Sequence, residues 1–239
     1  MSKTELIVQD MGGKHNINLS ATSERLRKDG AWKKQRIVVI LPADHQMSTK
    51  VALSHWNLIF PPNNAVVRIL AVGAEVGAAY SEAIESVLAH PELSKWDDIL
   101  TIESDNMPPA DGVLKLLKDM DDHPEYHCIG GLYFTKGDGG VAHIWGDPKD
   151  PVLNFRPQVP IPNTVQECCG SSMGFHLWRM EMFKDKRIER PLFRTLASKD
   201  GVGTQDLEFW GKARKYGYRT AVDTSIAVGH YEASTDITW

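Results

Sequence analysis

The sequence predicts an α/β fold with a mainly parallel central sheet flanked by helices. Short runs of strand-forming residues, such as 37–41 and 99–102, alternate with segments in which apolar residues recur at helical spacing. Strands that are apolar on both faces are typical of parallel sheets, because helices cover both sides of such a sheet. Regular alternation of these strands with helices predicts right-handed crossover connections.

The composition favours an ordinary globular protein and excludes a strong general attraction to polyanions. Of the 239 residues, 42% are hydrophobic and 24% are charged, and the net charge is −4. A net negative charge does not attract nucleic acid or anionic membranes. Residues 1–36 are the exception, with eight Lys and Arg against four Asp and Glu. We therefore expect residues 1–35 to form a polar, basic extension with a turn at Gly12 and Gly13, and residues 36–239 to form the folded domain.

The sequence shows no targeting or membrane-spanning signal. Residues 1–10 are too polar for a signal peptide, and no apolar run approaches the length of a membrane span. The three cysteines lack the spacing of a zinc site or a disulfide framework, so we expect small buried side chains in a reducing compartment. These features predict a cytoplasmic protein.

Periodicity and chain breakers give the order of the elements. Strands are expected at 37–41, 65–72, 99–102 and 127–134, and helices at 48–60, 75–90 and 110–120. The apolar members of the first helix would be Val51, Leu53, Trp56 and Ile59. The residues expected to face inward from the third helix are Val113, Leu116, Leu117 and Met120.

The second half of the chain is less regular. Residues 135–167 contain five prolines and little periodicity, and such long irregular stretches are usually functional. A turn and strand are expected at 169–177, a short helix at 179–183, and a helix between Thr204 and Gly217. Extended segments follow at 218–222 and 226–228.

Two carboxylates, Glu103 and Asp105, follow the strand at 99–102 directly, and Pro108 and Pro109 then turn the chain. Ligands of open α/β sheets bind beyond the carboxyl ends of the strands. Two acids at this edge suit a hard divalent cation, and Mg²⁺ often uses one or two carboxylates together with substrate phosphates. Acidic residues also commonly end strands and begin turns, so the spacing alone leaves both interpretations open.

Three blocks of the sequence, 99–109, 170–183 and 203–230, occur in a specific order and spacing. They resemble, in turn, the DxD strand, the glycine-rich segment with its Arg-x-x-x-Phe helix, and the Glu-Asp helix with its Gly-Tyr strand and closing Gly-His, of inverting GT-A glycosyltransferases. The family-two group is the most similar. The resemblance covers residues 36–232. It implies a GT-A (Rossmann-like) fold with a smaller antiparallel sheet on the acceptor side.

The chain departs from that family pattern at three places. Glu103 stands where the family has its first aspartate, which keeps the charge on a longer arm. Gln205 replaces the usual glutamate of the Glu-Asp pair. Tyr80 and Ser81 replace an Arg-Asn pair early in the second helix, so a phosphate contact there lacks its usual residues.

The resemblance implies a divalent cation, Mn²⁺ or Mg²⁺, held by Glu103, Asp105 and His230. Such a cation would stabilise the negative charge that gathers on a diphosphate leaving group. An imidazole ligand favours Mn²⁺. The alternative interpretation of His230 is a surface histidine that follows a strand.

The resemblance also implies that Asp206 is the general base that deprotonates the acceptor hydroxyl. The alternative is a first-turn acid that only favours the helix dipole. Trp145 could stack on a sugar ring or anchor its own loop. The residues expected to bind the donor nucleotide sugar are Pro42, Asp44, Glu75, Ser104, Gly170 and Gln205.

The resemblance implies a transferase that moves a sugar from a UDP- or GDP-linked donor to an acceptor hydroxyl, with inversion at the anomeric carbon. The acceptor stays open among a glycan, a lipid-linked sugar, a protein and, because residues 1–36 are basic, a modified DNA base. One rival is a sugar nucleotidyltransferase, which would need a basic, glycine-rich loop after the first strand, where this chain has Pro42-Ala43-Asp44-His45. The other rival is a non-catalytic nucleotide- or sugar-binding relative.

Overall fold

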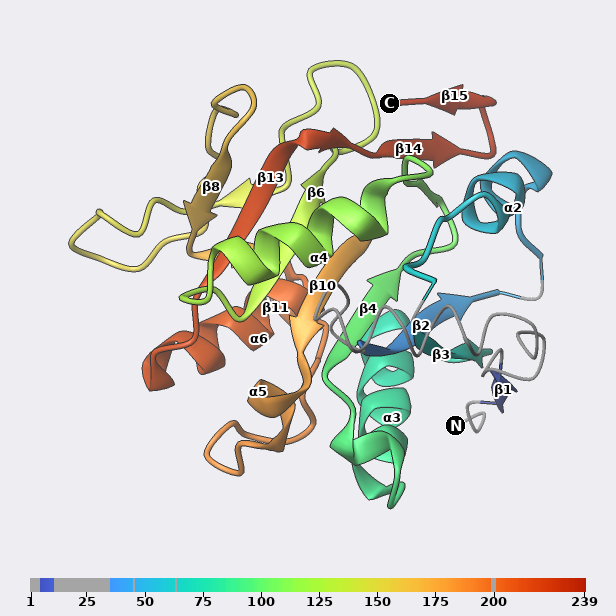
Figure 1. The fold of residues 1–239 in the computed structure, drawn as a ribbon. Coiled ribbons are helices and arrows are strands. Elements are labelled where there is room, and N and C mark those ends of the chain that lie inside the picture. The colour runs from blue at the N-terminus through green and yellow to red at the C-terminus, as the bar shows by residue number, and fades with distance from the viewer. Residues whose placement is uncertain (1–4, 11–34, 45, 63, 199–200) are drawn as a thin grey trace.

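Among the residues that the structure describes, eight strands form one central sheet with helices on both faces (Figure 1). This computed structural model describes residues 5–10, 35–44, 46–62, 64–198 and 201–239. The strands of the sheet are β1 (Glu5–Asp10), β2 (Arg36–Ala43), β3 (Ala65–Val72), β4 (Asp98–Ile102), β6 (Cys128–Leu132), β8 (Val165–Cys168), β10 (Phe175–Arg179) and β13 (Thr220–Ala227). Their order across the sheet is β1-β3-β2-β4-β10-β6-β13-β8.

The helices are α2 (Thr49–Trp56), α3 (Val76–Ala89), α4 (Gly112–Asp122), α5 (Met180–Lys184) and α6 (Gln205–Ala213), with short 3-10 turns at Leu93–Lys95 and Arg214–Tyr216. The described part of the chain also contains three small antiparallel sheets. They are β5 (Asn106–Met107) with β14 (Gly229–Glu232) and β15 (Ile237–Thr238), β7 (Ile144–Trp145) with β9 (Gly170–Ser171), and β11 (Leu196–Ser198) with β12 (Gly201–Gly203).

The predicted α/β class and the mainly parallel sheet are confirmed. Strands β3, β2, β4, β6 and β13 run in one direction, and β1, β10 and β8 run against them. The central place of β10 is a difference from expectation, because it lies antiparallel between β4 and β6 and interrupts the parallel series. The small sheet β15-β14-β5 begins just beyond the carboxyl end of β4.

Each face of the sheet carries its own apolar layer, and β2 contributes to both. Val38 and Ile40 belong to the layer under α3, α5 and α6, whereas Ile37, Val39 and Leu41 belong to the layer under α4. Side chains alternate along a strand, so a continuous β-branched run is buried on both sides. Figure 1 shows the corresponding arrangement, with α4 on one side of the sheet and α3 on the other.

The clearest helical patterns correspond to α3, α4 and α6. Helix α3 begins after Glu75, whose side chain accepts the N–H of Ala78 at 3.1 Å, as an N-cap does. Helix α6 begins after Thr204, and the chain reverses at Gly217 with a φ of +87°, which glycine adopts without strain. The residues predicted to face inward from α4 are all buried: Val113, Leu116, Leu117 and Met120.

The prediction for residues 48–60 is wrong in its end, and most of the apolar members do not reach the core. Helix α2 begins after the predicted Ser48 but ends at Trp56. Leu53, Trp56 and Ile59 are exposed by 60%, 87% and 51% instead of facing the core. In this helix only Val51 is buried.

The position of α2 explains this exposure. It lies against β5 at the end of the sheet and not across a sheet face. Its contacts there are polar: the Ser54 hydroxyl donates to the Pro108 carbonyl at 2.8 Å, and Nε2 of His55 lies 2.8 Å from the Asn106 carbonyl. Apolar spacing in a sequence cannot distinguish these two positions.

Part of the predicted N-terminal extension joins the sheet. Strand β1 pairs antiparallel with β3 from Glu5 opposite Val72 to Asp10 opposite Val67. The edge of β3 would otherwise present unpaired N–H and C=O groups, and β1 satisfies them. The expected turn at Gly12 and Gly13 lies outside the described residues. The division into 1–35 and 36–239 stays a prediction.

Two expectations about the whole chain concern membranes and cysteines. No helix in the described ranges combines the length and the apolar character needed to span a bilayer. Cys128, Cys168 and Cys169 are all buried and free, as expected of small core side chains.

Trp178 is central to the core under α6. Its ring stacks on Trp210 with centroids 5.4 Å apart, and its Nε1 donates to the Thr101 hydroxyl at 2.9 Å. We expect Trp178→Ala to lower the free energy of unfolding by about 3–5 kcal/mol, because it removes a fully buried aromatic side chain and leaves a cavity. Trp56→Ala is the matched control, since Trp56 is 87% exposed, and should change stability by less than about 0.5 kcal/mol. Urea denaturation measures both, and equal losses would contradict the core assignment.

Candidate active site

The turn that follows β4 is held from both sides by backbone hydrogen bonds. The N–H of Glu103 donates to the carbonyl of Gly174 at 3.1 Å, and the N–H of Tyr231 donates to the carbonyl of Asp105 at 2.7 Å. The first bond comes from the segment before β10 and the second from β14. Three segments far apart in the sequence therefore fix the position of this turn.

This turn forms one wall of a cavity of about 390 Å³ at the carboxyl ends of β2 and β4. The volume lies within the range of small-molecule sites. Ligands of open α/β sheets bind at this edge. Five predicted site residues share the cavity with three apolar neighbours, and together its lining is Pro42, Ala43, Asp44, Ala74, Val76, Glu103, Ser104 and Asp105.

Two basic side chains approach the same oxygen of Asp105. Nζ of Lys136 lies 2.5 Å from Oδ2 and Nε2 of His230 lies 3.4 Å from it. Burial alone would raise the pKa of Asp105, but the hydrogen bonds from His230 and Lys136 outweigh this effect and lower the pKa to about 2. Asp105 is therefore a carboxylate at neutral pH.

The backbone sets the orientation of His230. Its Nδ1 lies 2.7 Å from the carbonyl oxygen of Phe134, and because a carbonyl can only accept, Nδ1 carries the hydrogen. Nε2 can then donate a hydrogen bond to Asp105 only when the ring carries both protons; with a proton on Nδ1 alone, Nε2 faces Asp105 with a lone pair. A lone pair and a carboxylate oxygen repel each other unless a proton or a cation lies between them. Metal-binding histidines are held in this way, with the other ring nitrogen donating to a carbonyl.

Glu103 has no hydrogen-bond or ion-pair partner for its carboxylate among the described residues. Desolvation raises its pKa to about 8, and the negative charges of Asp105 and Asp206 add to the rise. In the described part of the chain, no group of three or more His, Cys, Asp and Glu is already arranged as a metal site. Asp105 and His230 are the close pair, and Glu103 belongs to the same turn.

Asp206 lies in the first turn of α6 and is buried. Its Oδ1 accepts the N–H of Leu207 at 2.9 Å. Desolvation raises its pKa, and hydrogen bonds from the hydroxyls of Thr204 and Ser172 partly oppose this rise. A carboxyl with a raised pKa is the stronger base, which is the property that a general base near neutral pH needs. The catalytic role of Asp206 stays a prediction.

Glu75 and Gln205 lie beside the cavity and are not among its lining residues. Glu75 accepts the hydroxyl of Thr195 at 2.6 Å. Burial favours a higher pKa for Glu75, but this bond and backbone N–H groups lower the pKa overall. A Cβ added to Gly77 would lie 3.1 Å from Cβ of Gln205, so the start of α6 packs against the start of α3.

Gly170 and Trp145 pair with each other in the sheet β7-β9. A Cβ on Gly170 would lie 2.9 Å from Leu207 and 3.0 Å from Phe155, so the close approach that this glycine permits is to apolar side chains. The structure does not bring Gly170 to the cavity. Nε1 of Trp145 lies 3.5 Å from the Ser172 hydroxyl, which holds the loop of Trp145 near the segment before β10.

Lys136 is a site residue that the sequence predictions did not include. Residues 134–142 form a hairpin, closed by pairing of Phe134 with Ala142, and Lys136 lies near its tip. We call this segment the hairpin 134–142. The glycines in 137–140, between two apolar stretches, are the available sequence signal for such a hairpin.

A stacked pair of rings lies behind His230. The rings of Tyr133 and His143 are 4.3 Å apart, and the His230 ring meets them edge-on at 5.4 Å and 5.9 Å. The Tyr133 hydroxyl accepts the N–H of Gly174 at 2.9 Å. Nδ1 of His143 is hydrogen-bonded with the Ser172 hydroxyl. Burial lowers the pKa of His143 to about 3, so its ring is a neutral, fixed support for His230.

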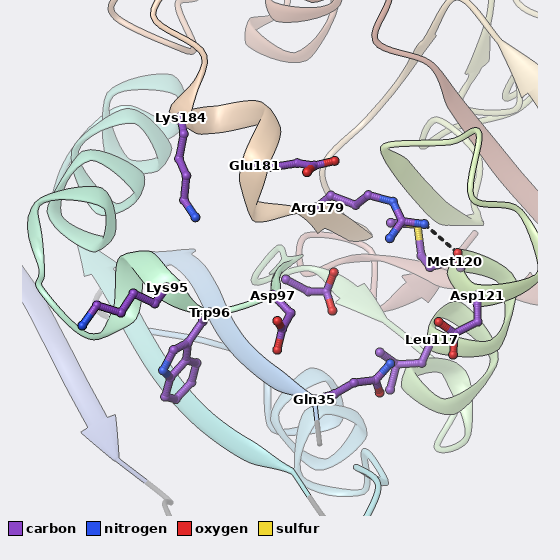
Figure 2. Close-up of a pocket in the computed structure, with 11 residues that line it drawn as sticks. Gln35, Lys95, Trp96, Asp97, Leu117, Met120, Asp121, Arg179, Glu181 and Lys184 are labelled. Atoms are coloured by element: carbon purple, nitrogen blue, oxygen red, sulfur yellow. Dashed lines mark hydrogen bonds between the residues drawn. The ribbon is translucent and has the colours of Figure 1, made fainter. Parts of the chain in front are cut away.

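A second cavity, of about 400 Å³, lies at the opposite edge of the sheet, where β4 begins and β10 ends (Figure 2). Arg179 lies across it and donates to the carbonyls of Met120 at 2.7 Å and Tyr126 at 3.0 Å. Asp97 pairs with Arg36 at 3.2 Å. These charges already have partners within the protein, and none of the predicted site residues lines this cavity. The cavity at the carboxyl edge is therefore the candidate site.

Comparison with known proteins shows a similarity of fold. No protein-family model matches the chain, and no curated protein does. Among solved structures, the chain is similar to A197 from STIV, with a TM-score of 0.55 and 16% identity over 83% of this chain and 86% of that one. It is also similar to S. aureus TarS 1–349, with a TM-score of 0.47 and 18% identity over 80% of this chain and 59% of that one. For a second S. aureus TarS structure the TM-score is 0.49 and the identity 17%, over 81% of this chain and 36% of that one.

These similarities concern the fold alone. The chain spans 59% and 36% of the two TarS structures, whose TM-scores lie below those of clear fold matches. The likeness to A197 covers most of both chains. A mostly parallel sheet between helical layers, with a small antiparallel sheet beside it, is a GT-A-like fold.

Gly174 is the closest backbone approach in the site. A Cβ there would lie 2.2 Å from Oδ1 of Asn106 and 2.7 Å from the Tyr133 hydroxyl. We expect Gly174→Ala to lower the free energy of unfolding by about 1–3 kcal/mol through overpacking. Gly211→Ala is the matched control, because Gly211 lies inside α6 with no atom within 4 Å of an added Cβ. It should raise stability by roughly 0.5–1 kcal/mol. Chemical denaturation measures both signs, and a Gly174→Ala variant as stable as the parent would contradict the close packing.

Proposed function

We propose that this chain is a glycosyltransferase that moves a sugar from a nucleoside diphosphate sugar to an acceptor hydroxyl. The observation that carries the proposal is the approach of His230 to Asp105 at 3.4 Å, beside the unpartnered Glu103, on the rim of the cavity. The GT-A-like fold and the order of the three sequence blocks support the same conclusion.

The donor atoms of the site fit a divalent cation. Nε2 of His230 lies 3.4 Å from Oδ2 of Asp105, and the Phe134 carbonyl fixes the ring by accepting from Nδ1, which leaves Nε2 as the nitrogen that can bind a cation. A carboxylate and an imidazole together suit Mn²⁺ better than Mg²⁺. Asp105, His230 and Glu103 are the residues that would hold the cation. When bound, it would stabilise the negative charge on the departing diphosphate.

The end of β2 and the start of α3 form the expected nucleoside subsite. The carboxylate of Asp44 can accept hydrogen bonds from ribose hydroxyls or from a base N–H. Pro42, Ala74 and Val76 provide an apolar wall on the same cavity. Glu75 lies between the last two in sequence, but its carboxylate is already occupied by Thr195 and by the cap of α3.

Asp206 would act on the acceptor. In the proposed reaction the acceptor oxygen attacks the anomeric carbon while its proton passes to the carboxylate of Asp206. The bond between the anomeric carbon and the diphosphate oxygen breaks, and the nucleoside diphosphate leaves with the bonding electrons. Attack opposite the leaving group gives inversion. Gln205, next to Asp206, can hydrogen-bond a sugar hydroxyl without adding charge.

Two other functions would use the same cavity. A sugar nucleotidyltransferase would need cationic side chains where β2 ends, and Pro42 and Ala43 at its end and Asp44 directly after it provide none. A non-catalytic binding protein would retain nucleotide affinity and lack turnover. The two experiments below distinguish these cases.

Calorimetric titration of UDP and of GDP, each with and without Mn²⁺, tests the donor site. We expect one nucleotide to bind only with Mn²⁺, and Asp105→Ala to weaken that binding by at least about 100-fold, because the cation loses its principal carboxylate. Asp122→Ala is the matched control, since Asp122 is an exposed residue that pairs with Lys118 on the surface of α4. Failure of both nucleotides to bind the parent protein with Mn²⁺ would refute the donor assignment.

Asp206→Asn tests the catalytic base. Release of nucleoside diphosphate from UDP-glucose, UDP-N-acetylglucosamine and GDP-mannose, with water in place of the acceptor, measures turnover. We expect the variant to lose about 10²–10⁴-fold in kcat, because the amide cannot take the proton. Nucleotide affinity should stay within about threefold of the parent value, since the proposed role of Asp206 is toward the acceptor and not the nucleotide. Asp122→Asn controls for the change of charge. Undiminished turnover in Asp206→Asn would exclude this base, and a parent protein that binds nucleotide without any turnover would favour the binding-protein alternative.

A further inference from the structure

Lys136 occupies the side of Asp105 that a bound cation would use. Its Nζ lies 2.5 Å from Oδ2, the same oxygen that His230 approaches at 3.4 Å. One carboxylate oxygen cannot hold an ammonium at this distance and a divalent cation at the same time without strong repulsion between the two positive charges. The Lys136 ammonium and a divalent cation would therefore compete for Oδ2 of Asp105.

The hairpin 134–142 connects the two basic groups. Its first residue, Phe134, accepts from Nδ1 of His230 at 2.7 Å, and its tip carries Lys136. Its base is fixed, because the N–H of His143 donates to the carbonyl of Tyr133 at 3.0 Å. The hairpin 134–142 thus fixes the imidazole of His230 and also carries the ammonium of Lys136, whose side chain is long and partly exposed.

The diphosphate of a bound nucleotide would be a second anionic partner for Lys136. The ionisable residues that line it are Asp44, Glu103 and Asp105, all acidic. A nucleoside diphosphate adds further negative charge, so its entry requires nearby cations. Lys136 does not itself line the cavity, but its ammonium pairs with Asp105, which does. After leaving Asp105, the ammonium on its flexible stem would be close enough to contact phosphate oxygens bound to the incoming cation. A lysine is suited to this exchange, because its charge is compact and its stem is flexible.

We propose that Lys136 is exchanged between two anions: it neutralises Asp105 in the unliganded protein, gives way to the divalent cation, and then contacts the diphosphate of the donor. Lys136 thereby weakens binding of the cation alone and strengthens binding of the nucleotide once the cation is present. This coupling makes the cation and the nucleotide enter together. The inference rests on the proposed function and adds to it a residue that sets the order of binding.

Lys136→Met tests the exchange by binding alone, without turnover. Calorimetry with Mn²⁺ as the only ligand should show about two- to fivefold tighter binding than in the parent protein, the effect of removing a half-exposed ion pair. Titration of UDP and GDP at saturating Mn²⁺ should show roughly tenfold weaker binding of the preferred nucleotide, the effect of losing a charged hydrogen bond to phosphate. The signature is a pair of changes with opposite signs.

Two further variants complete the design. Lys149→Met removes an exposed lysine from a loop outside the cavity and should change neither affinity. Lys136→Arg retains a cation and should lie between Lys136→Met and the parent in both titrations, because its planar guanidinium differs from the compact ammonium. Loss of both affinities in Lys136→Met would indicate a merely structural role, and no change in either would indicate a bystander, so each result overturns the inference. A parent protein that binds neither Mn²⁺ nor nucleotide would instead remove the proposed function, and this inference with it.

Discussion

Strand β10 enters the central sheet antiparallel, with β4 on one side and β6 on the other, and the candidate site depends on this insertion. Just before β10, the carbonyl of Gly174 accepts the N–H of Glu103 at 3.1 Å. The insertion requires unusually close packing: a Cβ on Gly130 of β6 would lie 2.0 Å from the ring of His176 in β10. A side chain at Gly130 would separate the strands, and the turn after β4 would lose its support. The positions of Glu103 and Asp105 therefore depend on the segment that leads into β10, which carries neither residue.

The two carboxylates of that turn have opposite electrostatic states. The pKa of Asp105 is lowered to about 2 and that of Glu103 is raised to about 8. Both groups are desolvated, so burial does not explain the difference. Asp105 has Lys136 and His230 at hydrogen-bonding or near hydrogen-bonding distance, whereas Glu103 has only repulsive carboxylates and a more distant Lys136. In a cavity lined by acids, the placement of a few cations thus decides which carboxylate is charged, and it also governs which anionic ligand can enter.

Helical spacing of apolar residues predicted buried side chains correctly for α4 but not for α2. The inward residues of α4 were predictable because helical spacing records which side of a helix meets a sheet face. The same spacing failed for Leu53 and Trp56, because α2 lies at the end of the sheet, where polar side chains make its contacts. The edge position of Glu103 and Asp105 could be predicted from the strand that precedes them, whereas Pro42 and Asp44 were added to the site by the family resemblance; all four line one cavity. Their chemical roles stay proposals.

The sequence by itself determined the α/β class and the edge of the sheet at which Glu103 and Asp105 lie. These properties are local, because apolar periodicity and the residues that follow a strand are properties of short segments. Only the tertiary structure decided that β10 lies between β4 and β6. It also decided that the hairpin 134–142 contacts the site, where Lys136 pairs with Asp105, 31 residues away in sequence. The physical reason is that strand order and side-chain contacts arise from the packing of distant segments, whose relative positions no short stretch of sequence specifies.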